Sequence, residues 1–472
     1  MKKTIIAGTA ALSLVLLSGA AAADGMVYSG FPVTVKGYSG KKTTSVSYGG
    51  QIARHALHDS LKKLVGKGNG KPNPALKAQM MAYFSGKDAG RKIVAPATKG
   101  KFAVKQTEVD SLSKGKNLAG KTYKAAVAGM PNGMTGPELV AFWIDKASSA
   151  KKGFDAANGY DYGQLISKFI MGAVSYNQAV DGYLDEYLSA TKKPNDKPYS
   201  KGAAYTGKEH AWDEAFGYFG TPAHTLKLTP KQVYDIAKQR DVAAADMNRD
   251  GKVDLKTEMT FGPAYYAAGF DASVYDKGNS TSYLHTIAKA FLDGRKLLAA
   301  AKGEKLTDAQ RATLMGHAKT ISDNWEKVLA EATFKYAGSV YKDMVKLKTI
   351  TDAKGDPAKA FRAYAKHWGE LKGFSLALQA GKNNLGETAT RLNRMIGAGP
   401  LLLNASQVVD IDSKGNYVRD QGPEWGEYML HMAKVQKLLI DRFGVKARNN
   451  DVTGDMKALS DALGGKASAE ND

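Results

Sequence analysis

The chain of 472 residues contains no cysteine and has a formal net charge of +21. The missing cysteine excludes disulfides, thiolate metal sites and cysteine nucleophiles, so stability must come from a buried core. The length suits roughly two or three domains. Because the positive charges are scattered rather than gathered in one block, they favour solubility and loose attraction to acidic polymers over a nucleic-acid interface.

The first 23 residues have the pattern of a cleavable secretory signal. Lys2 and Lys3 precede an apolar run over residues 5–17, and residues 21–23 are all alanine. We therefore expect a periplasmic or secreted protein that begins near Asp24. No later segment has the roughly 20 uninterrupted apolar residues of a membrane span. The expected partners are metal ions and an envelope protein or anionic polymer, whereas nucleic acid and a membrane span are not expected.

Residues 28–50 alternate valine, threonine, serine and tyrosine with glycine, which predicts one or two short strands. From residue 51 onward the apolar side chains follow helical spacing. Thr229 and Thr307 each begin a Thr-x-x-Gln capping box, so helices should start there. Glycine and proline should end helices at Gly220 and near residue 397.

We predict a mainly α fold made of two tandem helical bundles, with a small N-terminal β element and an EF-hand-like calcium loop. The polar tail, residues 467–472, has no apolar face and is expected to be disordered. The expected divisions are a signal peptide (1–23), a segment with short strands and the first helices (24–100), helical bundle 1 (101–240), a calcium-loop junction (241–262), helical bundle 2 (263–445) and a C-terminal tail (446–472).

A calcium loop is predicted between the two bundles. Side-chain oxygens stand at loop positions 1, 3, 5 and 9, and Gly251 stands at position 6, where an EF-hand turns sharply. Position 12 is Thr257 in place of the usual bidentate glutamate, and a glutamate follows one residue later. A solvated acidic turn is the alternative interpretation. The expected calcium ligands are Asp246, Asn248, Asp250, Lys252 through its carbonyl, Asp254 and Glu258.

Histidine and carboxylate residues on two predicted helices form a second candidate metal site. His210, Asp213 and Glu214 stand at i, i+3 and i+4, so their side chains can project from one helix face. His367 and Glu370 stand at i and i+3 on another helix. Imidazole with carboxylate suits iron, zinc or manganese, and two facing helices could close such a site. Buried hydrogen-bonded pairs or surface ion pairs are the alternative.

Common catalytic signatures are absent from the sequence. It contains no His-Glu-x-x-His helix, no Gly-x-Ser-x-Gly elbow and no phosphate-binding P-loop. His55 and His58 are also spaced i, i+3, and we expect them to be a core or surface pair rather than ligands. No catalytic residue is predicted.

Three stretches resemble a family of exported bacterial proteins of unknown function that is similar to the imelysins. These stretches are Tyr162–Ile166, His210–Tyr218 and the loop Asp246–Glu258. Imelysins are iron-regulated periplasmic or surface proteins built as helical bundles. The resemblance implies such a fold for most of the mature chain and a connection with iron.

The imelysin motif Gly-x-His-x-x-Glu, proposed to bind metal, is matched in part. His210 matches the histidine, whereas Lys208 stands in place of the glycine and Asp213 in place of the glutamate. The sequence from His367 to Glu370 has the His-x-x-Glu part of the motif, with Ala365 in place of the glycine.

Two hypotheses about function follow from these observations. The first is a periplasmic protein that handles or binds metal, linked to iron acquisition, with calcium in the loop and iron or another transition metal at the helical residues. The second is a calcium-stabilised helical scaffold that binds an envelope partner or ligand and has no transition-metal site.

Overall fold

The computed structural model describes residues 27–276, 278–382 and 384–464. Over these residues the chain is mainly helical, as predicted, with two short antiparallel hairpins. The predicted signal peptide, residues 1–23, and the predicted disordered tail, residues 467–472, lie outside the described residues.

The α-helices are distributed along the whole of the described chain. Their bounds are α1 (Gly49–Val65), α2 (Pro74–Phe84), α3 (Val109–Leu112), α4 (Gly136–Ser149), α5 (Tyr162–Ile170), α6 (Gly207–Phe219), α7 (Pro230–Ala237), α8 (Val242–Ala245), α9 (Gly262–Asp271), α10 (Tyr283–Ala300), α11 (Asp308–Asp352), α12 (Ala358–Gln379), α13 (Gly386–Ile396), α14 (Trp425–Phe443) and α15 (Met456–Leu463).

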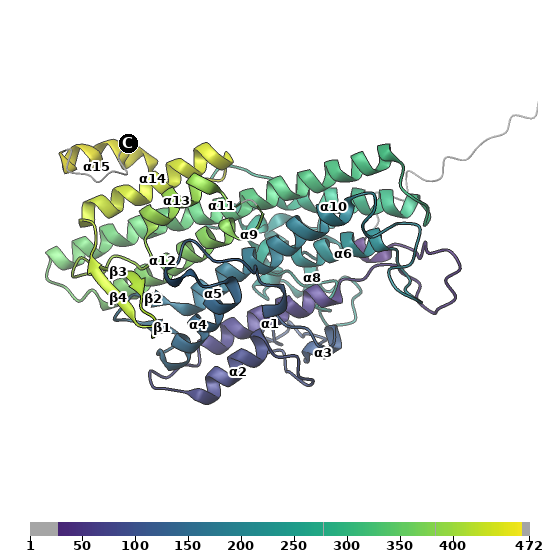
Figure 1. Cartoon of the computed structure of the whole chain (residues 1–472), viewed down its shortest axis with the longest axis horizontal. Helices are drawn as coiled ribbons and strands as arrows, with labels where there is room; N and C mark the ends of the chain where they lie inside the picture. The colour runs from purple at the N-terminus through teal and green to yellow at the C-terminus, as the bar shows by residue number, and fades with distance from the viewer. Residues whose placement is uncertain (1–26, 277, 383, 465–472) are drawn as a thin grey trace, which may run out of the picture.

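The longest helix, α11, runs along the molecule (Figure 1). With 45 residues it is about 67 Å long, and it packs against α10, α12 and α14. α12 also packs against α5, as do α1 and α4, and α2 packs against α1 and α4. Apolar residues at helical spacing in α11, including Ile321 and Trp325, are buried. Burial of the apolar faces of the helices holds them together.

The predicted helix boundaries are confirmed where the sequence carried a specific signal. Thr229 and Thr307 are the N-caps of α7 and α11, and both make the full capping box with the glutamine three residues later. α6 ends at Gly220, whose φ of +74° is the left-handed conformation that favours glycine. α13 ends before Gly397, which has a φ of +79°.

The predicted N-terminal strands are wrong. Residues 28–50 contain an isolated bridge between Pro32 and Thr44 and no strand. The two halves of this segment are joined by the backbone N–H of Ser45, which donates to the Phe31 carbonyl, and by the Thr44 hydroxyl, which donates to the carbonyls of Ser29 and Phe31. Tyr28 donates its backbone N–H to the Ala223 carbonyl, so the start of this segment is hydrogen-bonded to the chain just after α6 and not to a partner strand.

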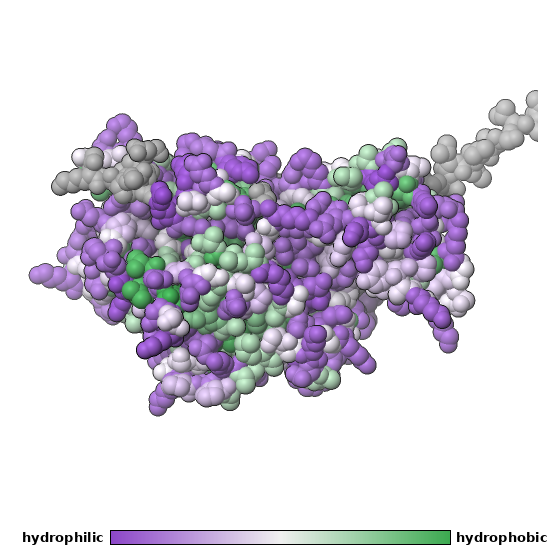
Figure 2. Space-filling model, in the orientation of Figure 1, coloured by the Kyte–Doolittle hydropathy of each residue, from purple (hydrophilic) through white to green (hydrophobic). Residues whose placement is uncertain are grey.

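The two hairpins lie elsewhere in the chain. β1 (Phe154–Asp155) pairs with β2 (Tyr160–Asp161), and β3 (Ser406–Ile411) pairs with β4 (Tyr417–Gln421). The face in Figure 2 is mostly hydrophilic, with a small hydrophobic area beside the β3–β4 hairpin. Val409 and Val418 of this hairpin are among the exposed large hydrophobic residues.

Buried hydrophobic side chains from both predicted bundles belong to one continuous core. α5, from the first predicted bundle, packs directly on α12 from the second. The division into two bundles stays a prediction. Within the described residues, no helix has both the length and the apolar character needed to cross a membrane.

α5 continues directly into a π-helix, η4 (Met171–Tyr183), of 13 residues. π-Helices usually occupy a single turn and are frequent at functional sites. Gly172 lets this segment approach α12 closely, because a Cβ there would lie 2.4 Å from the Ala377 carbonyl oxygen. The junction between α5 and η4 places Met171 at a cavity described below.

Candidate functional site

The predicted calcium loop lies between α8 and α9, and the Asp246 carboxylate closes its first turn. One oxygen of Asp246 accepts the backbone N–H of Asp250 at 3.1 Å, and the other accepts that of Gly251 at 2.9 Å. Gly251 has a φ of +79°, so the sharp turn expected at position 6 is present.

The next two side chains of the loop are held in the same way. Asn248 Oδ1 accepts the N–H of Asp250 at 2.9 Å, and Asp250 Oδ1 accepts the N–H of Lys252 at 2.9 Å. Lys105 Nζ lies 3.5 Å from Asp250 and 3.7 Å from Asp254, so an ammonium group stands beside two of the expected ligands. This part of the loop therefore attracts a cation.

Glu258 joins the two ends of the loop. Its carboxylate accepts the N–H groups of Met247 at 3.1 Å, Asn248 at 3.4 Å and Asp254 at 2.7 Å. Burial raises the pKa of Glu258, as do the nearby carboxylates, while its backbone hydrogen bonds lower it. The glutamate at position 13 thus turns back toward the loop, although position 12 is Thr257.

The loop is fixed to an extended segment that precedes α3. Val253 forms a parallel bridge with Val104. The Gln106 side chain donates to Asp254 Oδ1 at 2.8 Å and accepts the N–H of Leu255 at 2.9 Å. Residues 103–106 therefore hold the second half of the loop in place.

Two of the three predicted ligands on α6 lie together. His210 Nε2 is 3.7 Å from Glu214 Oε1, which also accepts a hydrogen bond from Gln51 at 2.8 Å. The His210 ring packs against Tyr199 and Tyr205, with ring centroids 4.2 and 4.6 Å away. Burial lowers the pKa of His210, although Glu214 opposes this shift.

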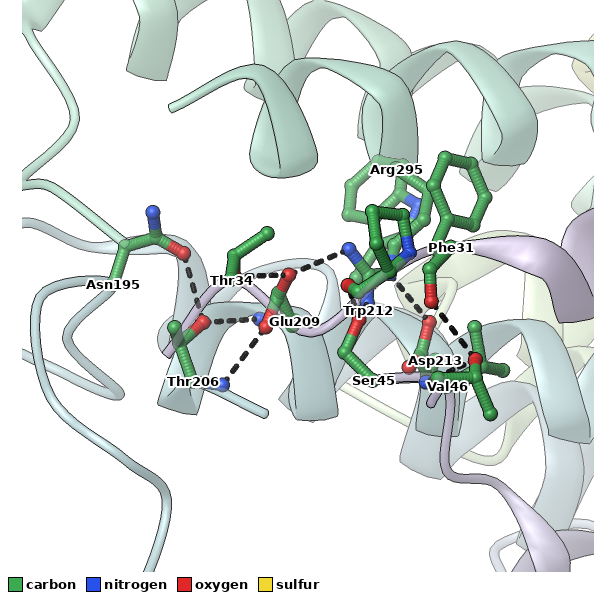
Figure 3. A network of polar contacts seen from close by, with 12 residues as sticks. Phe31, Thr34, Ser45, Val46, Asn195, Thr206, Glu209, Trp212, Asp213 and Arg295 are labelled. Atoms are coloured by element: carbon green, nitrogen blue, oxygen red, sulfur yellow. Dashed lines mark hydrogen bonds and ion pairs between the residues drawn. The ribbon is translucent and has the colours of Figure 1, made fainter. Parts of the chain in front are cut away.

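Asp213, the third predicted ligand on α6, belongs to a buried ionic network (Figure 3). Its Oδ1 accepts hydrogen bonds from Arg295 Nε and the Tyr28 hydroxyl, both at 3.0 Å, and its Oδ2 accepts the N–H of Ser47 at 3.1 Å. Protein donors therefore occupy both oxygens of this carboxylate.

The same network includes Glu209, which the sequence analysis missed. Arg295 Nη1 donates to Glu209 Oε1 at 2.8 Å, and the side chains of Arg295, Glu209 and Asp213 are fully buried. Thr34 donates to the same Glu209 oxygen at 2.9 Å, and Thr206 N donates to the other at 2.9 Å. We call Arg295, Glu209 and Asp213 the Arg295 network. It connects α10 and α6 with the N-terminal segment, by which we mean residues 28–47 before α1.

The predicted ligands on α12 make separate contacts. His367 Nδ1 is 2.6 Å from Asp343 Oδ2 on α11. Glu370 Oε1 lies 3.7 Å from Lys168 Nζ on α5 and accepts a hydrogen bond from the Tyr336 hydroxyl at 3.1 Å. Burial alone would raise the pKa of Glu370, but the surrounding lysines, Lys168 first among them, lower it.

The described residues contain no group of three or more histidine, cysteine, aspartate or glutamate side chains gathered closely enough to hold a metal ion. His210 and Glu214 are brought together, while Asp213, His367 and Glu370 take part in other pairs. Calcium and transition-metal binding both stay predictions.

His55 and His58 on α1 are buried in the core, which is the first of the two expected alternatives. His55 Nε2 lies 3.1 Å from the carbonyl oxygens of Gly217 and Tyr218, and His58 Nε2 lies 3.0 Å from Ser167 Oγ. Burial lowers the pKa of His55 to about 4 from its ordinary value of 6.5, while its two backbone hydrogen bonds oppose the shift. The folded protein therefore keeps His55 neutral.

This burial predicts a loss of stability in acid. The pKa of His55 is lower in the folded than in the unfolded chain, so the unfolded chain takes up the proton first as the pH falls. The contribution of His55 to the free energy of unfolding is therefore complete above pH 6.5 and is lost as the pH falls toward 4. Across that window we expect the wild-type protein to lose up to about 3 kcal/mol relative to His55→Gln. Urea unfolding of both proteins from pH 7.5 to 4 measures the difference; parallel stability curves would contradict it.

A cavity of about 430 Å³ lies directly after the loop in the chain, where Met259, Thr260 and Phe261 form part of its wall. The remaining wall comes from α1, the α5–η4 junction, α7 and α9, together with residues 95–96. Its size is within the range of small-molecule sites. This cavity was not predicted from the sequence, because its lining comes from segments far apart in the chain.

Comparison with known proteins places the chain in a family. The family model described as "Domain of unknown function (DUF4856)" matches residues 38–396, which include the loop, the residues of α6 and the whole cavity lining. No curated protein and no solved structure matches the chain. Because the match covers well over half of its length, the chain belongs to the DUF4856 family.

Proposed function

We propose that this protein is a calcium-stabilised helical binding protein of the cell envelope. The loop from Asp246 to Glu258 is its calcium site, and the cavity that follows the loop is its ligand site. The proposal is carried by one observation: Glu258 closes the loop from position 13 and is followed at once by the cavity wall, Met259 to Phe261. An ion that orders the loop therefore also orders the wall.

The donor set of the loop suits calcium. Calcium prefers six to eight oxygen ligands, from carboxylates, amides and backbone carbonyls. Binding would draw these oxygens inward around the ion, where the Lys105 ammonium now neutralises part of their charge. The residues proposed to hold calcium are Asp246, Asn248, Asp250, Lys252 through its carbonyl, Asp254 and Glu258.

The proposed location is outside the cytoplasm. Residues 1–23 have the pattern of a secretory signal, and calcium sites of extracellular modules bind with dissociation constants of about 10⁻⁴–10⁻³ M. A site of that affinity is filled where calcium is abundant, so its role is bracing rather than sensing. The imelysin-like arrangement of two helical bundles is part of the same proposal.

Calorimetric titration tests the calcium site. We expect the chelator-treated full chain to bind one calcium ion and the Asp250→Ala variant to bind none, because position 5 supplies a ligand carboxylate. The matched control is Asp412→Ala: Asp412 also accepts two backbone N–H groups, both at 2.8 Å, but in the β3–β4 turn. Binding that survives Asp250→Ala, or is lost in Asp412→Ala, would contradict the assignment.

Handling of a transition metal, including a link to iron, is the second proposed function. It is favoured by the His210–Glu214 pair, in which an imidazole and a carboxylate lie 3.7 Å apart on one helix face. Asp213, His367 and Glu370 would have to leave their present partners to join this pair. Loading with iron, zinc or manganese tests the proposal: a metal lost in His210→Ala supports it, and no bound metal in the wild-type protein contradicts it.

A further inference from the structure

The cavity after the calcium loop carries a surplus of positive charge. Four lysines line it: Lys62, Lys63, Lys168 and Lys238. Asp59 is the acidic residue of its lining. Within the described residues, Lys168 is the only one of the four lysines with a carboxylate in ion-pair range, at 3.7 Å from Glu370. The wall therefore carries a net positive charge that would attract an anion.

Thr260 and Lys168 are buried polar groups of the wall. Thr260 is 2% exposed, and its hydroxyl has no hydrogen-bond partner among the described residues. An unsatisfied buried hydroxyl is uncommon, and a ligand is one of the ordinary explanations. Lys168 is 3% exposed, and its ammonium lies over the rings of Tyr266 and Phe374, at 5.2 and 5.8 Å from the centroids.

Much of the remaining wall is apolar and aromatic, and Ser167 and Gln239 add two polar side chains to it. Met171, Met259 and Phe261 line the cavity together with Tyr265. The Tyr265 ring stacks on Tyr234, with centroids 4.9 Å apart, which fixes its orientation. Such a surface suits the hydrocarbon or ring portion of a small molecule.

Lys62 and Lys168 influence each other. Burial, and then the neighbouring Lys168, lower the pKa of Lys62 to about 7, while Glu370 and Asp59 oppose the shift. Burial also lowers the pKa of Lys168, which Glu370 opposes. A bound anion would relieve the repulsion between these two ammonium groups. The arrangement is therefore more favourable with an anion than without one.

We propose that this cavity binds a small organic acid. The anionic group, a carboxylate or a phosphate, is held by Lys62 and Lys168 and accepts a hydrogen bond from the Thr260 hydroxyl. The apolar or aromatic body lies against Met171 and Tyr265. This inference deepens the proposed function, because it names the ligand class of the site next to the calcium loop.

Binding of four simple probes to the calcium-saturated full chain tests the inference by calorimetry. Phenylacetate and phenyl phosphate carry both halves of the expected ligand, phenylacetamide lacks the charge, and inorganic phosphate lacks the ring. We expect at least one of the first two to bind at least tenfold more tightly than either of the last two, and the tighter one identifies the anionic group. The proposal would be overturned if phenylacetamide or inorganic phosphate bound as tightly as the tighter of the first two probes. It would also be overturned if none of the probes bound at millimolar concentration.

Three variants locate the binding in the cavity. Lys62→Met should lower the affinity for the tighter-binding probe at least tenfold. Lys346→Met, at an exposed position on α11, should leave this affinity unchanged. Thr260→Val should lower the affinity severalfold without lowering the melting temperature, because the hydroxyl has no hydrogen-bond partner to lose. Unchanged affinity in Lys62→Met and Thr260→Val would place the binding elsewhere.

The calcium proposal and the cavity proposal can fail separately. Loss of calcium binding in Asp250→Ala is measured without any probe, and loss of probe binding in Lys62→Met is measured with calcium saturated. A chain that binds phenylacetate or phenyl phosphate but no calcium would overturn only the first proposal. A chain that binds calcium but neither of these two probes would overturn only the second.

Discussion

Replacing Arg295 by methionine should lower the free energy of unfolding by about 3–5 kcal/mol, the usual cost of breaking a buried ion pair from one side. The guanidinium is fully buried and bonds to both Glu209 and Asp213. Without it, two carboxylates would remain in the core with no opposite charge. Urea unfolding followed by circular dichroism measures the change.

Two further variants separate this effect from a general loss of packing. Lys289→Met on the same helix removes the exposed ion pair with Asp293 and should cost less than about 1 kcal/mol. Combining Arg295→Met with Glu209→Gln and Asp213→Asn should recover part of the loss, because the buried charges are then gone. A loss below 1 kcal/mol in Arg295→Met itself would show that the network does not hold the N-terminal segment to α6 and α10.

Calcium should stabilise the folded chain by about 2.7 kcal/mol at a concentration one hundred times its dissociation constant. The physical reason is that the unfolded chain cannot gather the oxygens of residues 246–258 around one ion. Thermal unfolding in calcium and in chelator measures the shift. Asp250→Ala, which is expected to bind no calcium, should remove this stabilisation.

Asp412→Ala is the matched control for this second experiment. Its carboxylate accepts N–H groups of Lys414 and Asn416 in an ordinary turn, so its removal should lower stability equally with and without calcium. Magnesium at the same concentration should stabilise the wild-type protein less, because it demands a tighter octahedral site. A melting temperature that does not respond to calcium would contradict a bracing role for the loop.

Local signals in the sequence predicted the helices well. A capping box such as the one from Thr307 to Gln310 involves neighbouring residues, so its hydrogen bonds can be read from spacing alone. The same holds for Gly220, where a positive φ is needed directly after a helix. The β3–β4 hairpin was not predicted, although Val408, Val418 and the turn at Gly415 carry recognisable strand and turn residues.

The candidate sites depended on partners that lie far away in the sequence. The spacing predicted that Asp213 shares a helix face with His210. Three residues fall about 60° short of a full helical turn, so the Asp213 side chain points to one side of His210. Its carboxylate contacts Arg295 instead. Arg295 is 82 residues from Asp213, and no local pattern announces that contact. The cavity was missed for the same reason, since Lys62, Lys168 and Tyr265 come from three different helices.

Elemental analysis by mass spectrometry, on full-length protein purified without chelator, is the decisive test of the calcium site. We expect about one calcium per chain, which is absent from Asp250→Ala and kept in Asp412→Ala and His210→Ala. Wild-type protein that carries no calcium even after dialysis against millimolar calcium would contradict the proposed calcium-stabilised binding protein.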